Sequence, residues 1–345
     1  MVETTLQPEP VEWRFLLERP GPTALADERL ATRDLLGLPV DGRVIATGHQ
    51  AEIWHPGILA KDLAAAAVAR ALEATGVPAI PLHFIADHDA NDAGLLAYPT
   101  REIRRAGWRM LPAGSGRSLR DRSPAPPTAP PSDGFPDPFV EVGLQAVHDA
   151  ILRHRDAENL ASQLGRATAD LAHPLTGPIE RRSMSGLLDT PIGGFLLRRI
   201  ARDPSSCIRA HDEALEADRQ ARAARTGRLP RGVARPLGGR AVPELPLWRD
   251  TPEGRRPVRI DEPIDPRTCR PRALLATALA RLGPCDLFIH GTGGGLYDRV
   301  MESWLERWLG VELKDSLAPA VVATATLRLP IPVPDRIDSG EPPTP

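Results

Sequence analysis

Residues 43–92 contain the pattern that decides the fold, RVIATGHQAEIWHPGILAKDLAAAAVARALEATGVPAIPLHFIADHDAND. A short apolar run over 44–46 ends at a polar turn, and residues 58–75 are rich in Ala and Leu without Gly or Pro. A continuous apolar run is typical of a strand buried on both faces, and the second composition favours a helix. Another apolar run over 79–86 ends at an acidic turn. The stretch therefore predicts two parallel strands joined by a helix.

Both predicted strands end in turns with polar side chains. Parallel strands joined by a helix cross over in the right-handed sense, so both strand ends lie at the same edge of the sheet. Open α/β sheets bind their ligands at that edge. The candidate site residues are Thr47, Gly48, His49 and Gln50 after the first strand, His55 and Gly57 at the helix start, and Asp87, His88 and Asp89 after the second strand.

A similar unit occurs near the end of the chain. Residues 286–289 predict a short buried strand, and a glycine-rich turn leads from it into a helix over 296–309. Glycines let backbone N–H groups converge, and a helix start favours anions, although such a turn can also serve only to pack a helix on a sheet. The residues that we expect to bind substrate or nucleotide here are His290, Gly291, Gly293, Gly294, Tyr297 and Asp298.

The acidic turn allows several chemistries. Its carboxylates and imidazole could hold a metal, act as acid or base, or bind a ribose or an amine, and Asp89 could instead cap a turn. His49 and His55 are six residues apart and match no zinc motif, so we name no metal ligands and prefer phosphate binding by these histidines. A metal site built from His49, His55 and His88 stays open, although the spacing does not favour it. The predicted catalytic residues are His49, His55, Asp87, His88 and Asp89.

Composition excludes several classes of protein. The 345-residue chain has a formal net charge of −2, which implies no general attraction to nucleic acid or membrane. Its three cysteines lack a CxxC spacing and fit a reducing cytosol. The chain start lacks a signal-peptide pattern, and no uncharged apolar stretch reaches ~18 residues, so we expect a cytoplasmic protein. We expect a small-molecule partner, no nucleic acid and no membrane, and leave a homodimer open.

The stretch 43–92 resembles the opening of the bacillithiol-biosynthesis cysteine-adding enzyme family. That family has a T-G-Q-Q-A turn after its first strand, which matches Thr47 to Ala51 with His49 in place of the first Gln. Its E-D-H-D turn after the second strand matches Asp87 to Asp89. Residues 270–298 are similar in layout to the family's later segments. The histidine at position 55 and the glycine at 57 are similar to the H-x-G-H signature of the wider synthetase superfamily.

The resemblance implies a fold and an activity. The fold is an α/β, Rossmann-like parallel sheet of the nucleotidylyltransferase and class I synthetase kind. The activity is a small-molecule ligase that joins an amino acid, cysteine, to an amino-sugar malate conjugate, with ATP or ADP as a substrate left open. Two alternatives stay open, namely a metal-dependent hydrolase that uses the same His and Asp turns and a non-catalytic ligand-binding relative.

The sequence also suggests how the chain is organised. Residues 112–138 are dense in Pro, Gly and Ser, which indicates a linker or surface loop. We expect the middle of the chain to form an inserted, mainly helical subdomain. The predicted divisions are a first core part over 1–111, the linker over 112–138, the insertion over 139–264, a second core part over 265–330 and a disordered tail over 331–345.

Overall fold

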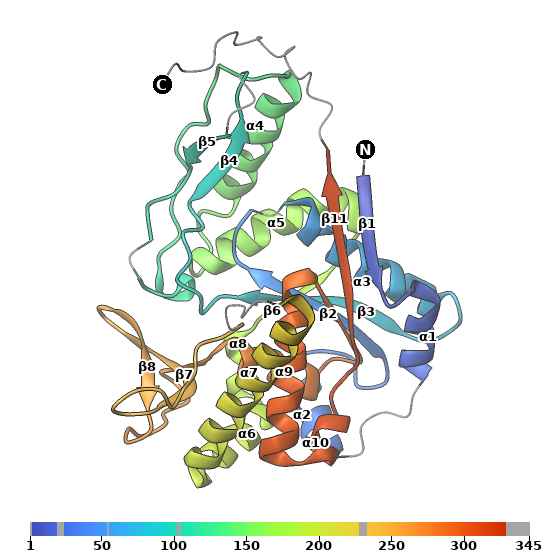
Figure 1. Ribbon diagram of the computed structural model, residues 1–345. Coiled ribbons are helices and arrows are strands. Elements are labelled where there is room, and N and C mark those ends of the chain that lie inside the picture. Colours follow the sequence, from blue (N-terminus) through green and yellow to red (C-terminus); the bar gives the residue numbers. More distant parts are fainter. Residues whose placement is uncertain are drawn as a thin grey trace, which may run out of the picture.

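The computed structural model describes residues 2–18, 24–53, 55–101, 105–114, 116–227 and 233–328, and its centre is a six-stranded sheet (Figure 1). The strand order is β1-β11-β10-β2-β3-β6. Strand β1 pairs antiparallel with β11 at one edge, and the other neighbours pair in parallel. The strands are β1 (Val2–Gln7), β2 (Arg43–Gln50), β3 (Ala79–Ala86), β6 (Glu180–Ser183), β10 (Leu287–His290) and β11 (Ala320–Leu327).

The parallel strands follow the Rossmann order. Along the chain, β2, β3 and β6 are added in one direction from the centre, and β10 and β11 are added on the other side of β2. Numbered among themselves, these strands therefore lie in the order 3-2-1-4-5. The predicted α/β class with a Rossmann-like parallel sheet is confirmed.

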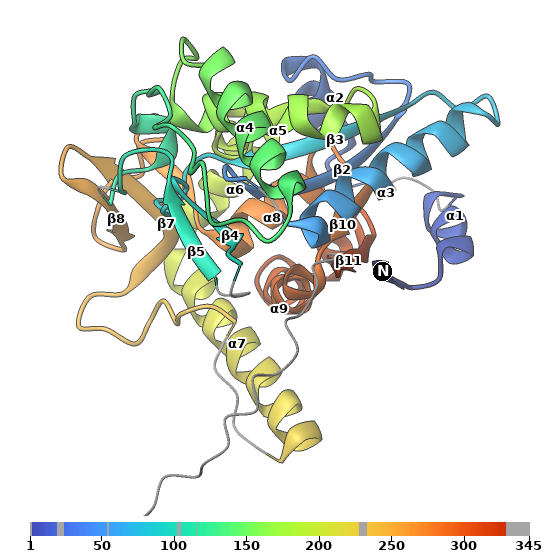
Figure 2. The ribbon, with the colours of Figure 1, turned by 90° about the horizontal axis from the view of Figure 1, so that it is seen from above.

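Helices cover both faces of the sheet (Figure 2). On one face, Ile45 and Ile289 share a core with α1 (Pro10–Glu18) and α3 (Pro56–Glu73). On the other face, Ala46 and Phe288 belong to a larger core that also contains buried side chains of several later helices. The helices on this side are α2 (Ala26–Leu35), α6 (Pro191–Arg202), α7 (Pro204–Thr226), α8 (Ala273–Leu282), α9 (Thr292–Leu309) and the short α10 (Val311–Asp315).

Several helices begin at a proline that follows a capping side chain. A proline at the first helical position has no N–H to leave unpaired, and the preceding side chain accepts a hydrogen bond from a free N–H of the first turn. These sequence signals fix where the helices start. The pairs are His55 and Pro56 in α3, Asp137 and Pro138 in α4, Thr190 and Pro191 in α6, and Asp203 and Pro204 in α7.

A second core lies beyond β3, and the hairpin of β4 and β5 packs there against two helices (Figure 1). Leu119 and Leu164 are fully buried in this core. The Pro-rich stretch 112–138 crosses the same region, and the backbone N–H of Leu119 donates to the carbonyl of Asp89. The elements are β4 (Leu95–Pro99), β5 (Arg105–Arg109), the 3-10 helix η1 (Leu119–Asp121), α4 (Pro138–Arg153) and α5 (Leu160–Thr176).

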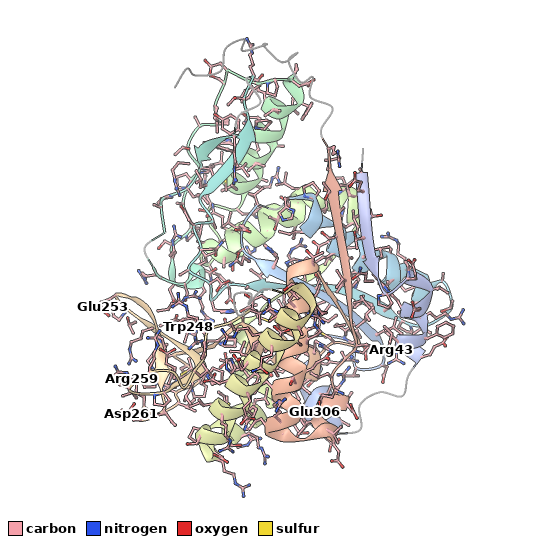
Figure 3. The ribbon with its side chains drawn as sticks, viewed as in Figure 1. Arg43, Trp248, Glu253, Arg259, Asp261 and Glu306 are labelled. Atoms are coloured by element: carbon pink, nitrogen blue, oxygen red, sulfur yellow. The ribbon has the colours of Figure 1, made fainter. Side chains whose placement is uncertain are left out.

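A small three-stranded sheet projects from the body and has many charged side chains (Figure 3). The ring of Trp248 lies between two guanidinium groups, 4.8 Å from that of Arg255 and 4.6 Å from that of Arg272. This stacking connects the hairpin to the start of α8. The strands are β7 (Glu244–Thr251), β8 (Gly254–Arg259) and β9 (Cys269–Pro271), and the 3-10 helix η2 (Ser185–Asp189) precedes α6.

Two predictions about the middle and end of the chain differ from the structure. The segment 139–264, predicted as a helical insertion, contributes β6 to the central sheet, and the domain boundaries themselves stay a prediction. The helix expected over 296–309 starts four residues earlier at Thr292, so the glycines form its first turn rather than a loop. The predicted tail over 331–345 lies outside the described residues.

None of the described helices is both long and apolar enough to cross a membrane.

The side chain of Trp304 gives a direct test of how α9 is attached. It is fully buried, stacks on Trp308 with ring centroids 5.4 Å apart, and donates from Nε1 to the carbonyl of Cys207 at 3.1 Å. We expect Trp304→Ala to lower the free energy of unfolding by about 3–5 kcal/mol, measured by urea denaturation. Phe15→Ala, at an exposed position, should change it by less than about 0.5 kcal/mol. Equal effects of the two substitutions would contradict this packing.

Candidate functional site

The carboxyl ends of β2 and β10 lie next to each other, and the strand order reverses between them. Thr47 pairs with Ile289, and the Thr47 hydroxyl donates to the Ile289 carbonyl at 2.8 Å. Helix α3 begins after β2 and α9 begins after β10, so two helix N-termini start at this edge. Ligands of open α/β sheets bind where the strand order reverses. We call the ends of β2 and β10, together with the first turns of α3 and α9, the switch-point edge.

The two polar turns that follow β2 and β3 are in direct contact. The amide of Gln50 donates to the Asp89 carboxylate at 2.7 Å. Arg255, from the β7–β8 hairpin, donates to the same carboxylate at 2.9 Å and to the carbonyl of His88 at 2.7 Å. Burial raises the pKa of Asp89, but His88, Gln50 and Arg255 outweigh this and leave the pKa below its usual value. The structure thus brings Gln50, His88 and Asp89 together, as the strand order predicts.

Asp87 turns toward β6 instead of toward β2. Its carboxylate accepts from the Ser183 hydroxyl at 2.7 Å and from the Ser185 N–H and hydroxyl at 3.0 and 2.6 Å. Burial raises the pKa of Asp87, but the neighbouring His88 and these serines lower it by more, so the net shift is downward. The carboxylate therefore anchors β6 and η2, and its predicted catalytic role stays a prediction.

The two predicted phosphate-binding histidines differ in their surroundings. Burial, together with the charge of Lys61, lowers the pKa of His49 to about 3, so its ring is neutral at pH 7. The Nδ1 of His55 accepts from the N–H of Gly57 at 3.1 Å, and His55 thereby caps α3. The proton of a neutral His55 ring is then on Nε2, and only that nitrogen could donate to a ligand.

Two of the predicted binding glycines are explained by packing. A Cβ atom at Gly57 would lie 2.8 Å from the Thr324 hydroxyl and 3.1 Å from the carbonyl of Ala325, so the start of α3 lies directly against β11. A Cβ atom at Gly48 would lie 3.0 Å from the carbonyl of Phe84 in β3. Both positions allow a close backbone approach that a larger residue would prevent.

His290 lies under the first turns of α9. Its Nε2 is 2.7 Å from the Asp298 carboxylate, which also lies 3.0 Å from Arg281. A Cβ atom at Gly294 would lie 2.4 Å from His290 Nδ1, so the glycine lets α9 pass over the ring. His290 shares the face of Phe288, whereas alternation along β2 puts His49 on the face of Ile45 and α3. The structure therefore does not bring the side chains of His49 and His290 together.

The remaining predicted residues occupy the start of α9. Gly291 is its N-cap, and Gly293 lies in its first turn, where an added Cβ atom would have no other atom of the described residues within 4 Å. Tyr297 packs, partly buried, against the core of the α9 face. These positions hold the helix start at the switch-point edge, and their predicted roles in binding stay predictions.

Lys61 is the residue at the switch-point edge that sequence reasoning missed. Its side chain is buried at 3% exposure, and Nζ donates to the carbonyl of Gly48 at 2.6 Å. Its Cδ is 3.9 Å from the Cβ position of Gly291, so the side chain lies between the ends of β2 and β10. Burial lowers the pKa of Lys61 to about 8, although the neighbouring Asp62 raises it. The signal that could have revealed it is a Lys-Asp pair inside an otherwise Ala- and Leu-rich helix.

A buried hydrogen bond between His83 and Asp62 lies next to Lys61. The Nδ1 of His83 in β3 is 2.7 Å from the carboxylate of Asp62 in α3, and both side chains have no solvent exposure. Arg181 of β6 lies 3.7 Å from the second oxygen of that carboxylate. Burial lowers the pKa of His83, and the charge and hydrogen bond of Asp62 oppose this shift. The group ties α3 to β3 next to Lys61.

A cavity of about 450 Å³ opens beside Asp87, at the carboxyl ends of β3 and β6. Its lining contains several guanidinium groups and hydroxyls together with three carboxylates. The N-terminus of α5, capped by Asn159, also lies at its wall. The charged and polar residues that line it include Arg120, Arg166, Arg181, Arg182, Ser162 and Ser183.

Within the part of the chain that the structure describes, no three or more His, Cys, Asp or Glu side chains are arranged to hold a metal ion. The His and Asp turns therefore do not form a ligand set among those residues. This matches the way in which Asp87 and Asp89 point toward different partners.

The fold and site define an α/β protein with a Rossmann-like sheet. No protein-family model and no curated protein matches the sequence. Among solved structures, the chain is similar to a Campylobacter jejuni protein described as a candidate arginyl-tRNA synthetase, at 13% identity and a TM-score of 0.30. The match covers 85% of this chain and 58% of that chain. Similarity of this degree carries no argument about activity, so the conclusions rest on this chain's own sheet and site.

The pKa of Lys61 predicts an effect of pH on stability. The folded-state value of about 8 lies below the ordinary value of 10.5, so between these values the unfolded chain binds more protons and stability rises with pH. Lys61→Met removes this contribution. The stability advantage of the Met variant over wild type should therefore shrink by roughly 2–3 kcal/mol between pH 7 and pH 10.

Urea denaturation at a series of pH values measures this effect. Arg70→Met removes a cation from an exposed position of the same helix and should leave the pH profile of stability unchanged. A constant difference between wild type and Lys61→Met over this range would show that Lys61 is not held in a desolvating site.

Proposed function

We propose that this chain is a small-molecule ligase-like enzyme whose reacting groups bind at the switch-point edge. The observation that carries the proposal is Lys61, a buried cation between the ends of β2 and β10 and beside the N-terminus of α9. A cation and the positive end of a helix dipole attract the same kind of ligand, namely a phosphate or a carboxylate. An activated carboxyl group would present such charges.

The roles of the residues follow from their geometry. Lys61 is mostly protonated at pH 7 and would bind an anionic oxygen, together with the first N–H groups of α9. The neutral ring of His49 and the Nε2 proton of His55 could donate further hydrogen bonds without adding charge. Donors that are fixed before the reaction stabilise the negative charge that develops in an acyl or phosphoryl transfer.

The acceptor substrate would bind nearer to β3 and β6. The resemblance of residues 43–92 to the cysteine-adding enzymes implies an amino-sugar conjugate that carries carboxylates, with cysteine as the amino acid to be joined. The arginine-containing cavity beside Asp87 suits a carboxylate-bearing group of that kind. ATP or ADP as a substrate, a cytoplasmic location and a homodimer belong to this proposal as well.

A thermal-shift screen against ATP, ADP, AMP, cysteine and sugar–malate conjugates tests the proposal. A ligand present at about 100 times its dissociation constant adds about 2.7 kcal/mol to the stability of the folded state. We expect at least one nucleotide or amino acid to raise the melting temperature of wild type. We expect Lys61→Met to abolish the shift caused by the anionic ligand and Arg70→Met to retain it.

The outcomes separate the proposal from a non-catalytic relative and from a ligand site elsewhere on the chain. Binding without turnover of any tested pair of substrates would favour a non-catalytic ligand-binding relative. A shift that is equal in wild type and in Lys61→Met would place the ligand elsewhere. No shift with any nucleotide or amino acid would end the ligase hypothesis.

A further inference from the structure

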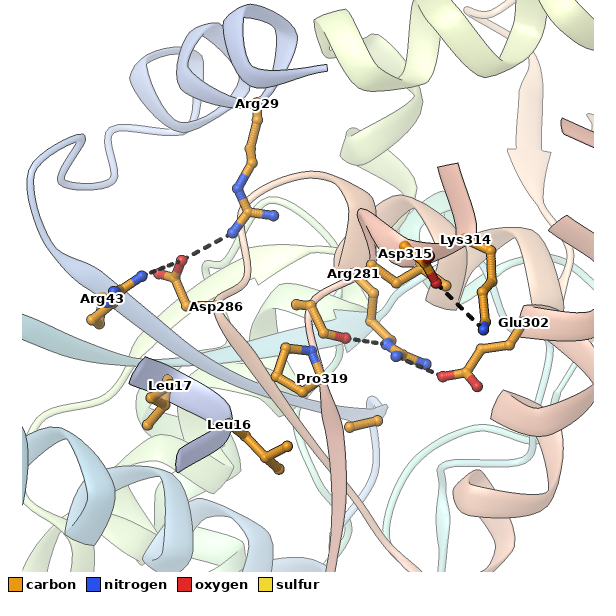
Figure 4. A pocket seen from close by; sticks show the side chains of 13 residues that line it. Leu16, Leu17, Arg29, Arg43, Arg281, Asp286, Glu302, Lys314, Asp315 and Pro319 are labelled. Carbon is orange, nitrogen blue, oxygen red and sulfur yellow. Dashed lines mark hydrogen bonds and ion pairs between the residues drawn. The ribbon is translucent and has the colours of Figure 1, made fainter. Parts of the chain in front are cut away.

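A second charged cavity lies at the opposite edge of the sheet, at the amino ends of β2, β10 and β11 (Figure 4). Its volume is about 270 Å³. Leu16 and Leu17 of α1 form an apolar wall, and the charged side chains face them across the cavity. Because parallel strands have all their amino ends on one side, this cavity is separate from the switch-point edge.

Three guanidinium groups share the carboxylate of Asp286 at this edge of the sheet, and two of them, Arg29 and Arg43, line the cavity. Asp286 lies 3.0 Å from Arg29, 2.5 Å from Arg33 and 3.5 Å from Arg43. Its carboxylate also accepts from the N–H of Val44 at 2.7 Å. Within the described residues these arginines pair with no other carboxylate, so two positive charges remain uncompensated there.

Arg29 also has an unused donor. Its side chain is more than nine-tenths buried and lines the cavity, and its Nη1 has no hydrogen-bond partner among the residues that the structure describes. Burial lowers the pKa of Arg29, and Asp286 only partly offsets this. A buried donor without a partner is costly, and a bound anion would satisfy it.

The far end of the cavity has no excess of positive charge. Glu302 lies 2.7 Å from Arg281, and Asp315 lies 3.4 Å from Lys314 (Figure 4). Arg281 also pairs with Asp298, so this end has no surplus of positive charge. The carboxylates here would repel a ligand with several negative charges and favour one anionic group at the arginine end.

We propose that this cavity binds a small oxyanion group, a phosphate or a carboxylate, between Arg29 and Arg43. Arg43 is partly exposed and provides access, whereas Arg29 supplies the buried donor. The rest of the ligand would lie on the leucines of α1. The site would join α1 and α2 to the amino ends of the central strands and is independent of the proposed ligase activity.

Isothermal titration calorimetry at constant ionic strength, with inorganic phosphate and with acetate as separate probes, tests the proposal. We expect at least one probe to bind wild type and Arg43→Gln to bind it roughly tenfold more weakly, because a charge-assisted contact is lost. Arg307→Gln, which removes an arginine of similar exposure outside the cavity, should bind as wild type does. Lys61→Met should also retain this binding, which separates the site from the switch-point edge.

A second measurement locates the anion without any substitution. Phenylglyoxal modifies accessible arginines, and mass spectrometry of the digested protein reports the modification of Arg43. The probe that binds should protect Arg43 and leave Arg307 reactive. Absence of binding by both probes, undiminished binding by Arg43→Gln, or binding that is lost only in Lys61→Met would each overturn the proposal.

Discussion

The parallel pairing of β2 with β3 on one side and β10 on the other is the constraint on which the structure depends. All eight residues of β2 are in register with β3, and the opposite edge pairs over 45–47 with β10. Each crossover must be right-handed. Helix α3, which leads from β2 to β3, and helix α9, which leads from β10 toward β11, therefore lie on opposite faces of the sheet. Both helices must nevertheless begin at the same edge, and this requirement creates the switch-point edge.

The same constraint explains why charged residues are buried at both ends of β2. At its amino end, Asp286 accepts from the backbone of Val44 and from arginines of α2, which fixes the start of β2 against β10. At its carboxyl end, Lys61 donates to the carbonyl of Gly48. These contacts supply partners for backbone groups where the sheet ladder ends, which is where such groups would otherwise be buried without partners.

Much of the fold could be predicted from short-range sequence patterns. Part of the site could be predicted as well, because the order of the strands decides which turns meet. The apolar run over 79–86 coincides with β3, and strand order brings Gln50 and Asp89 into contact. Strand β6 has the sequence ERRS, whose charged side chains give no apolar pattern, so only its pairing with β3 reveals it. Side-chain directions depend on distant segments, since Asp87 turns toward Ser183 and Ser185 after β6. Lys61 lies inside α3 and not in a turn after a strand, so a search for polar turns at strand ends does not find it.

The energetics of Lys61 favour a functional reading over a structural one. Burial of an ammonium group costs free energy, and its position beside the N-cap of α9 adds repulsion from the positive end of the helix dipole. Asp62 does not cancel this, since its carboxylate is engaged with His83 and faces Arg181. A methionine would fill the same volume without the charge penalty. An anion beside the ammonium group and the first N–H groups of α9 would offset both costs, which is the physical reason for proposing an anionic ligand at this edge.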